Sequence, residues 1–209
     1  MSIQYNSPVV LNYALLSAAV LLLSQVIPGE LMGFFTIYPV VDFLNPVWYF
    51  RLFSHVIGHI NWEHLVSNFT LILLIGPILE EKYGSKNLIL MILVTALITG
   101  VLQILFFDTA LLGASGVAFM MILLGSFANA RSGKIPLTFI LIVILFLGKE
   151  VYQSVSNDDV SQFAHIIGGI CGGIFGFILT DANDVSAPVT PKAGTLPADP
   201  TLSKSKKNS

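Results

Sequence analysis

The segment "LLGASGVAFMM", from Leu111 to Met121, places a single hydroxyl group, that of Ser115, among apolar and very small residues. Gly113, Ala114 and Gly116 surround the serine, although leucine or isoleucine would make a more hydrophobic membrane helix. Small residues allow a neighbouring backbone or an incoming chain to approach closely. The segment therefore predicts a helix with space beside its serine. Any side chain that contacts the serine in this space must come from another part of the chain.

The composition is typical of an integral membrane protein. Of the 209 residues, 55% are hydrophobic and 11% are charged, and the mean hydropathy of +0.82 lies far above that of a soluble domain. The net charge is only −2 and the basic residues are scattered, which argues against a nucleic-acid partner. The single cysteine, Cys171, excludes an intramolecular disulfide. The lipid bilayer is the expected surrounding.

Six apolar stretches come close to the length of about 20 residues that a spanning helix requires. Turn-forming residues separate them, so the predicted fold class is an all-α membrane protein with a bundle of six transmembrane helices over residues 1–180. Residues 181–209 are rich in Pro, Ala, Ser, Thr and Lys, which predicts a disordered cytoplasmic tail. The predicted spans are Val9 to Ile27, His64 to Leu79, Asn87 to Phe107, Ala114 to Ala130, Ile135 to Tyr152, and Val160 to Thr180.

The distribution of basic residues predicts the orientation, because cytoplasmic loops carry an excess of Lys and Arg. Both termini are then expected in the cytoplasm of a multi-pass protein of the cell membrane. The long first connection, from Pro28 to Trp62, faces outward and is too apolar for water, so we expect it to rest on or partly within the outer leaflet. Eight of the basic residues lie on the cytoplasmic side: Lys82, Lys86, Arg131, Lys134, Lys192, Lys204, Lys206 and Lys207.

A few polar side chains interrupt the predicted spans, where such groups are costly and are functional or bundle-internal by default. His64 and Asn68 lie four residues apart, hence on one face of the second span. Ser115 opens the fourth span and His165 lies near the start of the sixth. These three spans run in the same direction, so all four groups are expected at similar depth. The fourth span covers only about 25 Å of a core of about 30 Å, which predicts that its serine is recessed in a water-accessible pocket.

This arrangement would support acyl transfer. A serine hydroxyl needs a neighbouring base, and histidine titrates near neutral pH. Small residues recur every four positions in the sixth span, so it can pack closely enough on the fourth for a hydrogen bond between Ser115 and His165. The helix start at Ser115, together with His64 and Asn68, could donate to a developing oxyanion. The recurring small residues are Ala164, Gly168, Gly172 and Gly176.

The chain resembles the rhomboid intramembrane serine proteases, in the compact six-helix form found in bacteria. The resemblance covers roughly Trp48 to Ile178 and rests on five segments in the right order. They are "WYFRLFSH" (48–55), "HINWEHLVSN" (59–68), "EEKYGS" (80–85), "GASG" (113–116) and "AHIIGG" (164–169).

The resemblance implies a role for each matching residue. Ser115 would be the nucleophile and His165 the base. The oxyanion hole would consist of His64, Asn68 and the Ser115 backbone N–H, with Gly113 shaping the nucleophile loop. The substrates would be single-span membrane proteins, and neither a metal nor another cofactor is implied.

Further positions match the family with other expected roles. Gln103 corresponds to a position near the active-site water. Phe119 keeps the ring that stacks on the histidine, where some family members have tyrosine. Trp48 and Arg51 match the Trp-Arg segment of the first loop, although two residues separate them here. Positions that look structural are Arg51, His55, His59 and Glu80.

Other interpretations of these residues stay open at this point. His64 could serve to hold the first loop to the second span, and Arg51, His55 and His59 have a spacing that resembles a metal site but lack a fourth ligand. An inactive rhomboid-like binder of membrane proteins would be marked by loss of Ser115 or His165. A small transporter would show internal repeats and polar groups near the middle of the membrane.

Overall fold

The computed structural model describes residues 5–27, 30–126, 137, 140–141, 144–145 and 159–186. Over these residues the regular structure is helical, which confirms the all-α class. The predicted fifth span lies outside the described residues for most of its length. The elements are α1 (Pro8–Val26), the 3₁₀ helix η1 (Leu31–Phe35), α2 (Pro46–Ser54), α3 (Trp62–Tyr83), α4 (Ser85–Phe106), α5 (Ser115–Ser126) and α7 (Asp159–Ser186).

The helix lengths follow the predicted spans. In the described part of the chain, α1, α3 and α4 are long and apolar enough to cross a membrane, whereas α5 and the apolar part of α7, from Phe163 to Leu179, are shorter. The short helix α5 begins at Ser115, as the segment around this serine predicted. Helix α7 continues to Ser186, beyond the predicted end of the sixth span at Thr180. A helix needs apolar side chains only within hydrocarbon, so hydropathy does not detect this polar extension.

Local sequence signals account for the helix boundaries closest to the site. The side chain of Asn61 caps α3 by accepting a hydrogen bond from the backbone N–H of His64 at 2.8 Å. Gly84, with φ of 81°, separates α3 from α4 in a left-handed conformation that glycine adopts without strain. The cap at Asn61 thus places His64 in the first turn of α3.

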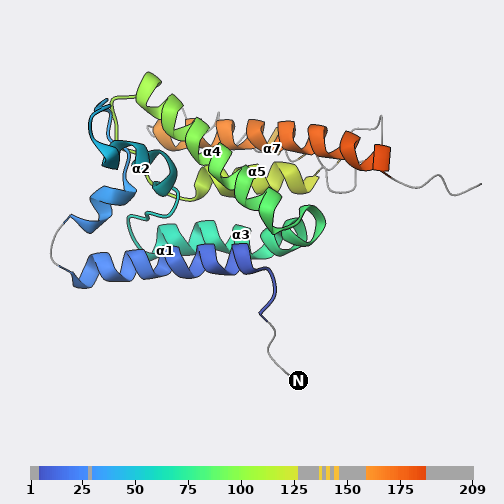
Figure 1. The fold of residues 1–209 in the computed structure, drawn as a ribbon, viewed down its shortest axis with the longest axis horizontal. Coiled ribbons are helices and arrows are strands. Elements are labelled where there is room, and N and C mark those ends of the chain that lie inside the picture. The colour runs from blue at the N-terminus through green and yellow to red at the C-terminus, as the bar shows by residue number, and fades with distance from the viewer. Residues whose placement is uncertain are drawn as a thin grey trace, which may run out of the picture.

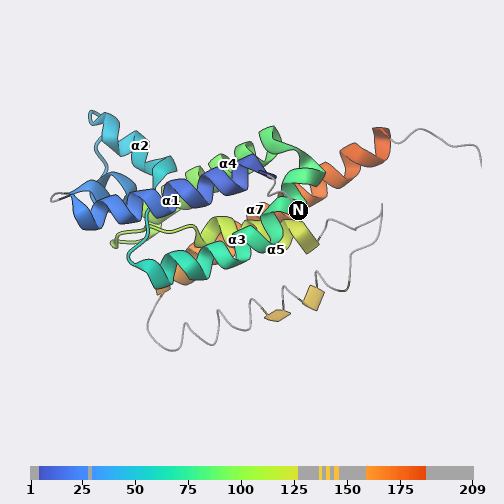
Figure 2. The same ribbon diagram turned by 90° about the horizontal axis from the view of Figure 1, so that it is seen from below.

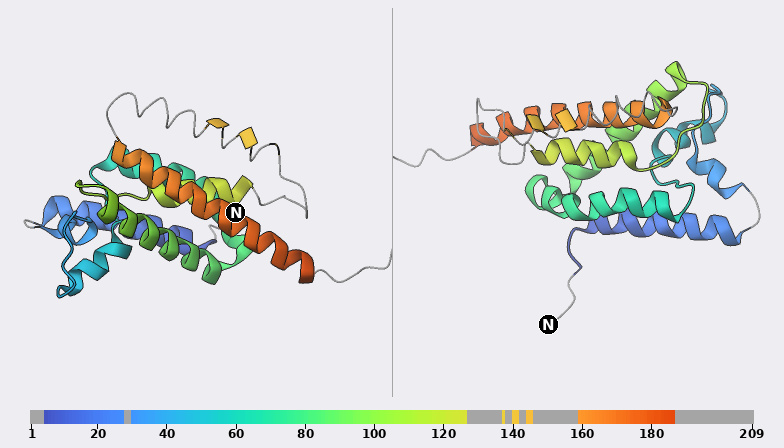
Figure 3. Two further views of the ribbon diagram at one scale, coloured as in Figure 1. Left: turned by 90° about the horizontal axis from the view of Figure 1, so that it is seen from above. Right: turned by 180° about the vertical axis from the view of Figure 1, so that it is seen from behind.

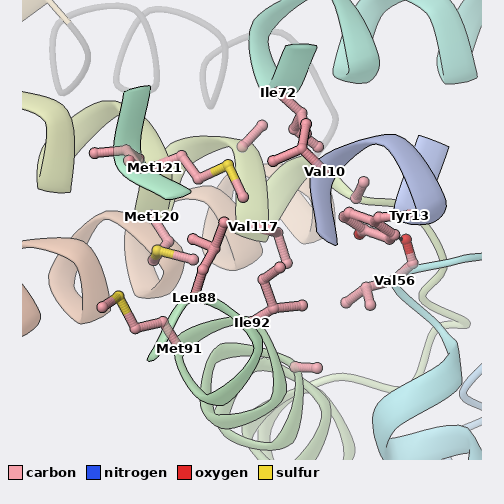
Figure 4. Close-up of a cluster of buried hydrophobic side chains, with 14 of the residues drawn as sticks. Val10, Tyr13, Val56, Ile72, Leu88, Met91, Ile92, Val117, Met120 and Met121 are labelled. Atoms are coloured by element: carbon pink, nitrogen blue, oxygen red, sulfur yellow. Dashed lines mark hydrogen bonds between the residues drawn. The ribbon is translucent and has the colours of Figure 1, made fainter. Parts of the chain in front are cut away.

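The helices pack as successive layers, with α1 beside α3, α3 beside α5, and α5 beside α7 (Figures 1 and 3). Helix α4 crosses this stack and contacts α7, and α2 lies against α4 at one end of the molecule (Figure 2). Helix α5 is apolar on all sides and is buried along most of its length, as expected for the central helix of a bundle. The core beside it joins side chains from α1, α3, α4 and α5, among them Val10, Ile72, Leu88, Val117 and Met121 (Figure 4).

Glu80 joins α1 to the turn between α3 and α4. Its buried carboxylate accepts hydrogen bonds from the backbone N–H groups of Val9 and Val10 at 3.0 and 3.1 Å. It also accepts one from the Ser85 hydroxyl at 2.7 Å. These first-turn N–H groups have no partner within α1, so the carboxylate satisfies donors that would otherwise be buried unpaired.

The backbones of α5 and α7 come into direct contact along the predicted stripe of small residues. A β-carbon added to Gly168 would collide with the carbonyl oxygen of Gly116, and one added to Gly172 would collide with that of Met120. The neighbouring Gly173 has no described atom within 4 Å of such a carbon. Glycine is therefore required on the face of α7 that meets α5 and is not required one residue further on.

This difference predicts the effect of alanine at each position. Gly168→Ala should lower the free energy of unfolding by about 1–3 kcal/mol, because backbone atoms cannot move aside as a flexible side chain can. Gly173→Ala should be neutral, or slightly stabilising through the better helix propensity of alanine. Unfolding of both variants in detergent micelles, followed by circular dichroism, measures the difference. Equal destabilisation by the two substitutions would contradict the packing described here.

Candidate active site

The segment that precedes Ser115 is held in place by the long connection between α1 and α3. Leu111 and Ile37 exchange two backbone hydrogen bonds, of 2.9 and 3.0 Å. The N–H of Gly113 donates to the carbonyl oxygen of His55 at 2.9 Å. The N–H of Ala114 donates to Nε2 of His59 at 3.3 Å. Of the four residues before the serine, Leu111, Gly113 and Ala114 are therefore held by hydrogen bonds to the connection between α1 and α3.

The two loop histidines are neutral, because burial lowers the pKa of both His55 and His59 to about 4. Neutral His59 can accept from Ala114 through Nε2 while Nδ1–H donates to the carbonyl oxygen of Ile57 at 3.0 Å. His55 directs Nδ1 to the Arg51 carbonyl at 3.2 Å and Nε2 to the Thr99 hydroxyl at 3.4 Å. All four ring nitrogens serve the fold, which favours the loop-anchoring interpretation over metal ligation.

His64 and Asn68 both lie against Gly113. A β-carbon at Gly113 would approach His64 Nε2 to 2.8 Å and Asn68 Nδ2 to 3.9 Å, and the φ of 130° there is itself unfavourable for any other residue. Asn68 is only 6% exposed, yet its Nδ2 has no partner among the described residues, and neither has His64 Nδ1. Since buried polar groups are normally paired, unpaired groups beside the loop are candidates to meet a ligand.

His165 lies on the face of α7 that meets α5. Its ring centroid is 4.4 Å from that of Phe119, at an interplanar angle of 37°. Phe119 follows Ser115 by one helical turn, so the two side chains share a face of α5. A β-carbon on Gly116 would lie 3.3 Å from the carbonyl oxygen of Ala164, the residue before His165. The helix contact therefore sets His165 at the level of Ser115, and both residues are partly exposed.

Gln103 connects the end of α4 to the loop that leads to Ser115. Its side chain is 1% exposed, and Nε2 donates to the carbonyl oxygen of Thr109 at 3.0 Å and to the Thr109 hydroxyl at 3.2 Å. Its Oε1 has no partner in the described structure. The amide thus fixes the loop and keeps one buried acceptor available, which is compatible with the expected contact to a water molecule.

Trp48 and Arg51 anchor the long connection rather than the serine. Trp48 Nε1 donates to the carbonyl oxygen of Val40 at 3.0 Å. Arg51 Nε donates to that of Gly33 at 2.7 Å, and its guanidinium lies 4.9 Å from the centre of the Tyr38 ring. Both contacts tie α2 to the segment that precedes it.

Comparisons with known proteins show the family of the chain. The family model described as Rhomboid domain matches residues 47–182, from α2 into α7. The chain belongs to the rhomboid family. The match includes every residue that the resemblance placed in the site.

Curated relatives of this rhomboid chain come from bacteria and a plant. It is 27% identical over 137 residues to "Rhomboid protease GlpG" of Haemophilus influenzae, covering 64% of this chain and 70% of that protein. It is 25% identical over 174 residues to the protein of the same name from Serratia proteamaculans, covering 81% and 62%. The third, "RHOMBOID-like protein 2" of Arabidopsis thaliana, is 32% identical over 139 residues, covering 62% and 42%. The chain is thus a multi-pass membrane protein of a family of intramembrane proteases.

Gly113 is expected to tolerate no side chain if the loop serves catalysis. Gly113→Ala should reduce the cleavage rate by about 100-fold or more, because the methyl group displaces His64 from the oxyanion position. Gly84→Ala is the matched control, since Gly84 also has a positive φ but no atom within 4 Å of an added β-carbon. It should lower stability and leave cleavage of a membrane reporter nearly unchanged. Undiminished cleavage by Gly113→Ala would contradict a catalytic role for this loop.

The neutral histidines predict a pH-dependent stability. Their pKa of about 4 in the folded protein lies below the ordinary value of 6.5, so the unfolded chain binds more protons between these values. Stability should therefore be complete above pH 6.5, fall as the pH is lowered toward 4, and level off below that. Melting temperatures across this range measure the effect, and His59→Gln, which cannot titrate, should reduce the slope. A slope unchanged by His59→Gln would contradict the neutral state of His59.

Proposed function

We propose that this chain is an intramembrane serine endopeptidase that cleaves transmembrane segments with a Ser115–His165 dyad. The observation that carries the proposal is the backbone contact between α5 and α7 at Gly116, which sets His165 against Phe119, one turn from Ser115. The unpaired Asn68 amide and the His64 ring on the other side of the loop support it. A nucleophile, a base and candidate oxyanion donors then surround one helix start.

The proposed chemistry begins with attack of Ser115 Oγ on the scissile carbonyl carbon while His165 takes the hydroxyl proton. The negative charge on the carbonyl oxygen is stabilised by the Ser115 N–H, by Asn68 Nδ2 and by His64. When the C–N bond breaks, His165 returns the proton to the leaving amine. Water then attacks the acyl-enzyme while His165 accepts its proton. As the bond between the acyl carbon and Ser115 Oγ breaks, His165 gives this proton to Oγ, and the new carboxyl terminus leaves.

The membrane limits which substrates can be cut. A transmembrane helix hides its backbone, so a single-span substrate must unwind locally before it reaches Ser115. We propose that the site opens toward the outer side of the cell membrane, with both termini in the cytoplasm, as the distribution of Lys and Arg indicates. Residues 1–180 would form the catalytic membrane domain and residues 181–209 a cytoplasmic tail. The chemistry requires no metal or other cofactor.

The proposal predicts covalent labelling of the serine. A fluorophosphonate should label the purified protein, and Ser115→Ala should abolish both labelling and cleavage of a single-span reporter. His165→Ala should reduce both by about 1,000-fold or more, because the hydroxyl loses its base. Ser126→Ala is a matched control, since Ser126 lies on the same helix and donates its hydroxyl to the Ile122 carbonyl at 2.9 Å.

The outcomes separate the protease from a non-catalytic relative. Labelling that persists in Ser115→Ala would assign the nucleophile elsewhere. A wild-type protein that binds the reporter, is not labelled and leaves the reporter intact would support an inactive rhomboid-like binder and overturn the proposed function.

A further inference from the structure

A second polar site lies outside the candidate active site, in the connection between α1 and α3. Segment 36–45, helix α2 and helix α4 enclose a cavity of about 110 Å³. None of the residues proposed for the dyad or the oxyanion hole lines it. Two isoleucines contribute to its lining, and its polar and aromatic lining residues are Tyr38, Asp42, Asn45, Trp48 and Arg51.

Two opposite charges line this cavity without pairing with each other. The Arg51 guanidinium donates only through Nε to the Gly33 carbonyl, so its two terminal nitrogens have no hydrogen-bond partner among the described residues. Asp42 accepts one hydrogen bond, from the Leu44 N–H at 3.3 Å, and its second carboxylate oxygen has no described partner. Asp42 is exposed, and the partly buried Arg51 guanidinium lies against the Tyr38 ring. A donor fork and a carboxylate thus border the same cavity, and their charges are complementary to a small zwitterion.

The surroundings of the cavity are those of a membrane interface. The segment beside it exposes Phe43 to 68% and Leu44 to 97%, and the adjoining end of α4 exposes Phe106 to 67%. In Figure 1, α2 and this segment lie at the end of the bundle at which α3 and α5 begin. Exposed apolar side chains next to Trp and Tyr are typical of a segment at the membrane interface. In such a segment the apolar side chains lie among the acyl chains and the polar groups lie at the level of the headgroups.

We propose that this cavity binds the headgroup of a phosphoethanolamine lipid. The planar fork of Arg51 suits two phosphate oxygens, and the primary ammonium of ethanolamine has N–H groups to donate to Asp42. A choline headgroup has no N–H to donate, and a phosphoglycerol headgroup offers Asp42 hydroxyl groups but no positive charge. The acyl chains would lie along Phe43 and Leu44. This inference depends on the membrane location of the chain and is independent of proteolysis.

Short-chain lipids test the proposal without an activity assay. The purified full-length protein in detergent is titrated with dihexanoyl phosphatidylethanolamine, phosphatidylcholine or phosphatidylglycerol, and the rise in melting temperature yields each affinity. The wild-type protein should bind the ethanolamine lipid at least tenfold more tightly than either other lipid. Glycerophosphoethanolamine, which has the headgroup without chains, should bind at least tenfold more weakly than the ethanolamine lipid.

Asp42→Asn isolates the ammonium contact, because asparagine keeps an oxygen for the Leu44 N–H and loses the charge. It should remove the difference between the ethanolamine and choline lipids. Asp108→Asn is the matched control, since Asp108 is an exposed carboxylate that does not line the cavity, and it should keep the wild-type preference.

Three results would overturn the proposal. They are equal affinities of the wild-type protein for the ethanolamine and choline lipids, tighter binding of the phosphoglycerol lipid, and an ethanolamine preference that survives Asp42→Asn. Binding of glycerophosphoethanolamine as tight as that of the intact lipid would assign the cavity to a soluble phosphate ester instead of the bilayer.

Discussion

The backbone contact between α5 and α7 is the constraint on which the rest of this structure depends. Helix α5 is buried along most of its described length, Ser115–Ser126, so its position depends on the helices packed around it. Hydrocarbon provides no hydrophobic force between helices, and close packing of small residues replaces it. Gly168 and Gly172 have no side chain, which leaves room for the carbonyl oxygens of Gly116 and Met120 on α5. This close packing sets His165 beside the ring of Phe119. Stability of the bundle and geometry of the site therefore come from one set of contacts.

The loop before Ser115 is positioned from a distant part of the chain. Its backbone N–H groups are satisfied by His55 and by His59, which precedes Ala114 by 55 residues. His55 accepts through its backbone carbonyl oxygen. His59 accepts through Nε2, which is possible because burial keeps its ring neutral. The same arrangement leaves Asn68 Nδ2 without a hydrogen-bond partner among the described residues. The long connection thus acts as a scaffold for the loop that precedes the serine.

Polar groups at this end of the bundle divide into two sites with different solvents. Around Ser115 they surround a helix start that would have to admit water for the proposed hydrolysis. Around Arg51 and Asp42 they line a cavity bordered by exposed apolar side chains, where headgroups replace bulk water. Leu111 and Ile37 connect the two regions through paired backbone hydrogen bonds. Under the proposed lipid binding, the bilayer would be a ligand of the protein in the second site as well as its surroundings.

The sequence by itself determined the features that depend on local composition and period. Hydropathy predicted the all-α membrane class and a helix that opens at Ser115, and a spacing of four residues placed His64 with Asn68 and aligned the glycines of α7. Only the tertiary structure decided which loop groups hold the serine. The contacts of His59 with Ala114 and of Arg51 with Gly33 join positions that no periodicity relates. The sequence also could not show that Arg51 and Asp42 border one cavity, or that they make no ion pair among the described residues, because this depends on the positions of all their neighbours.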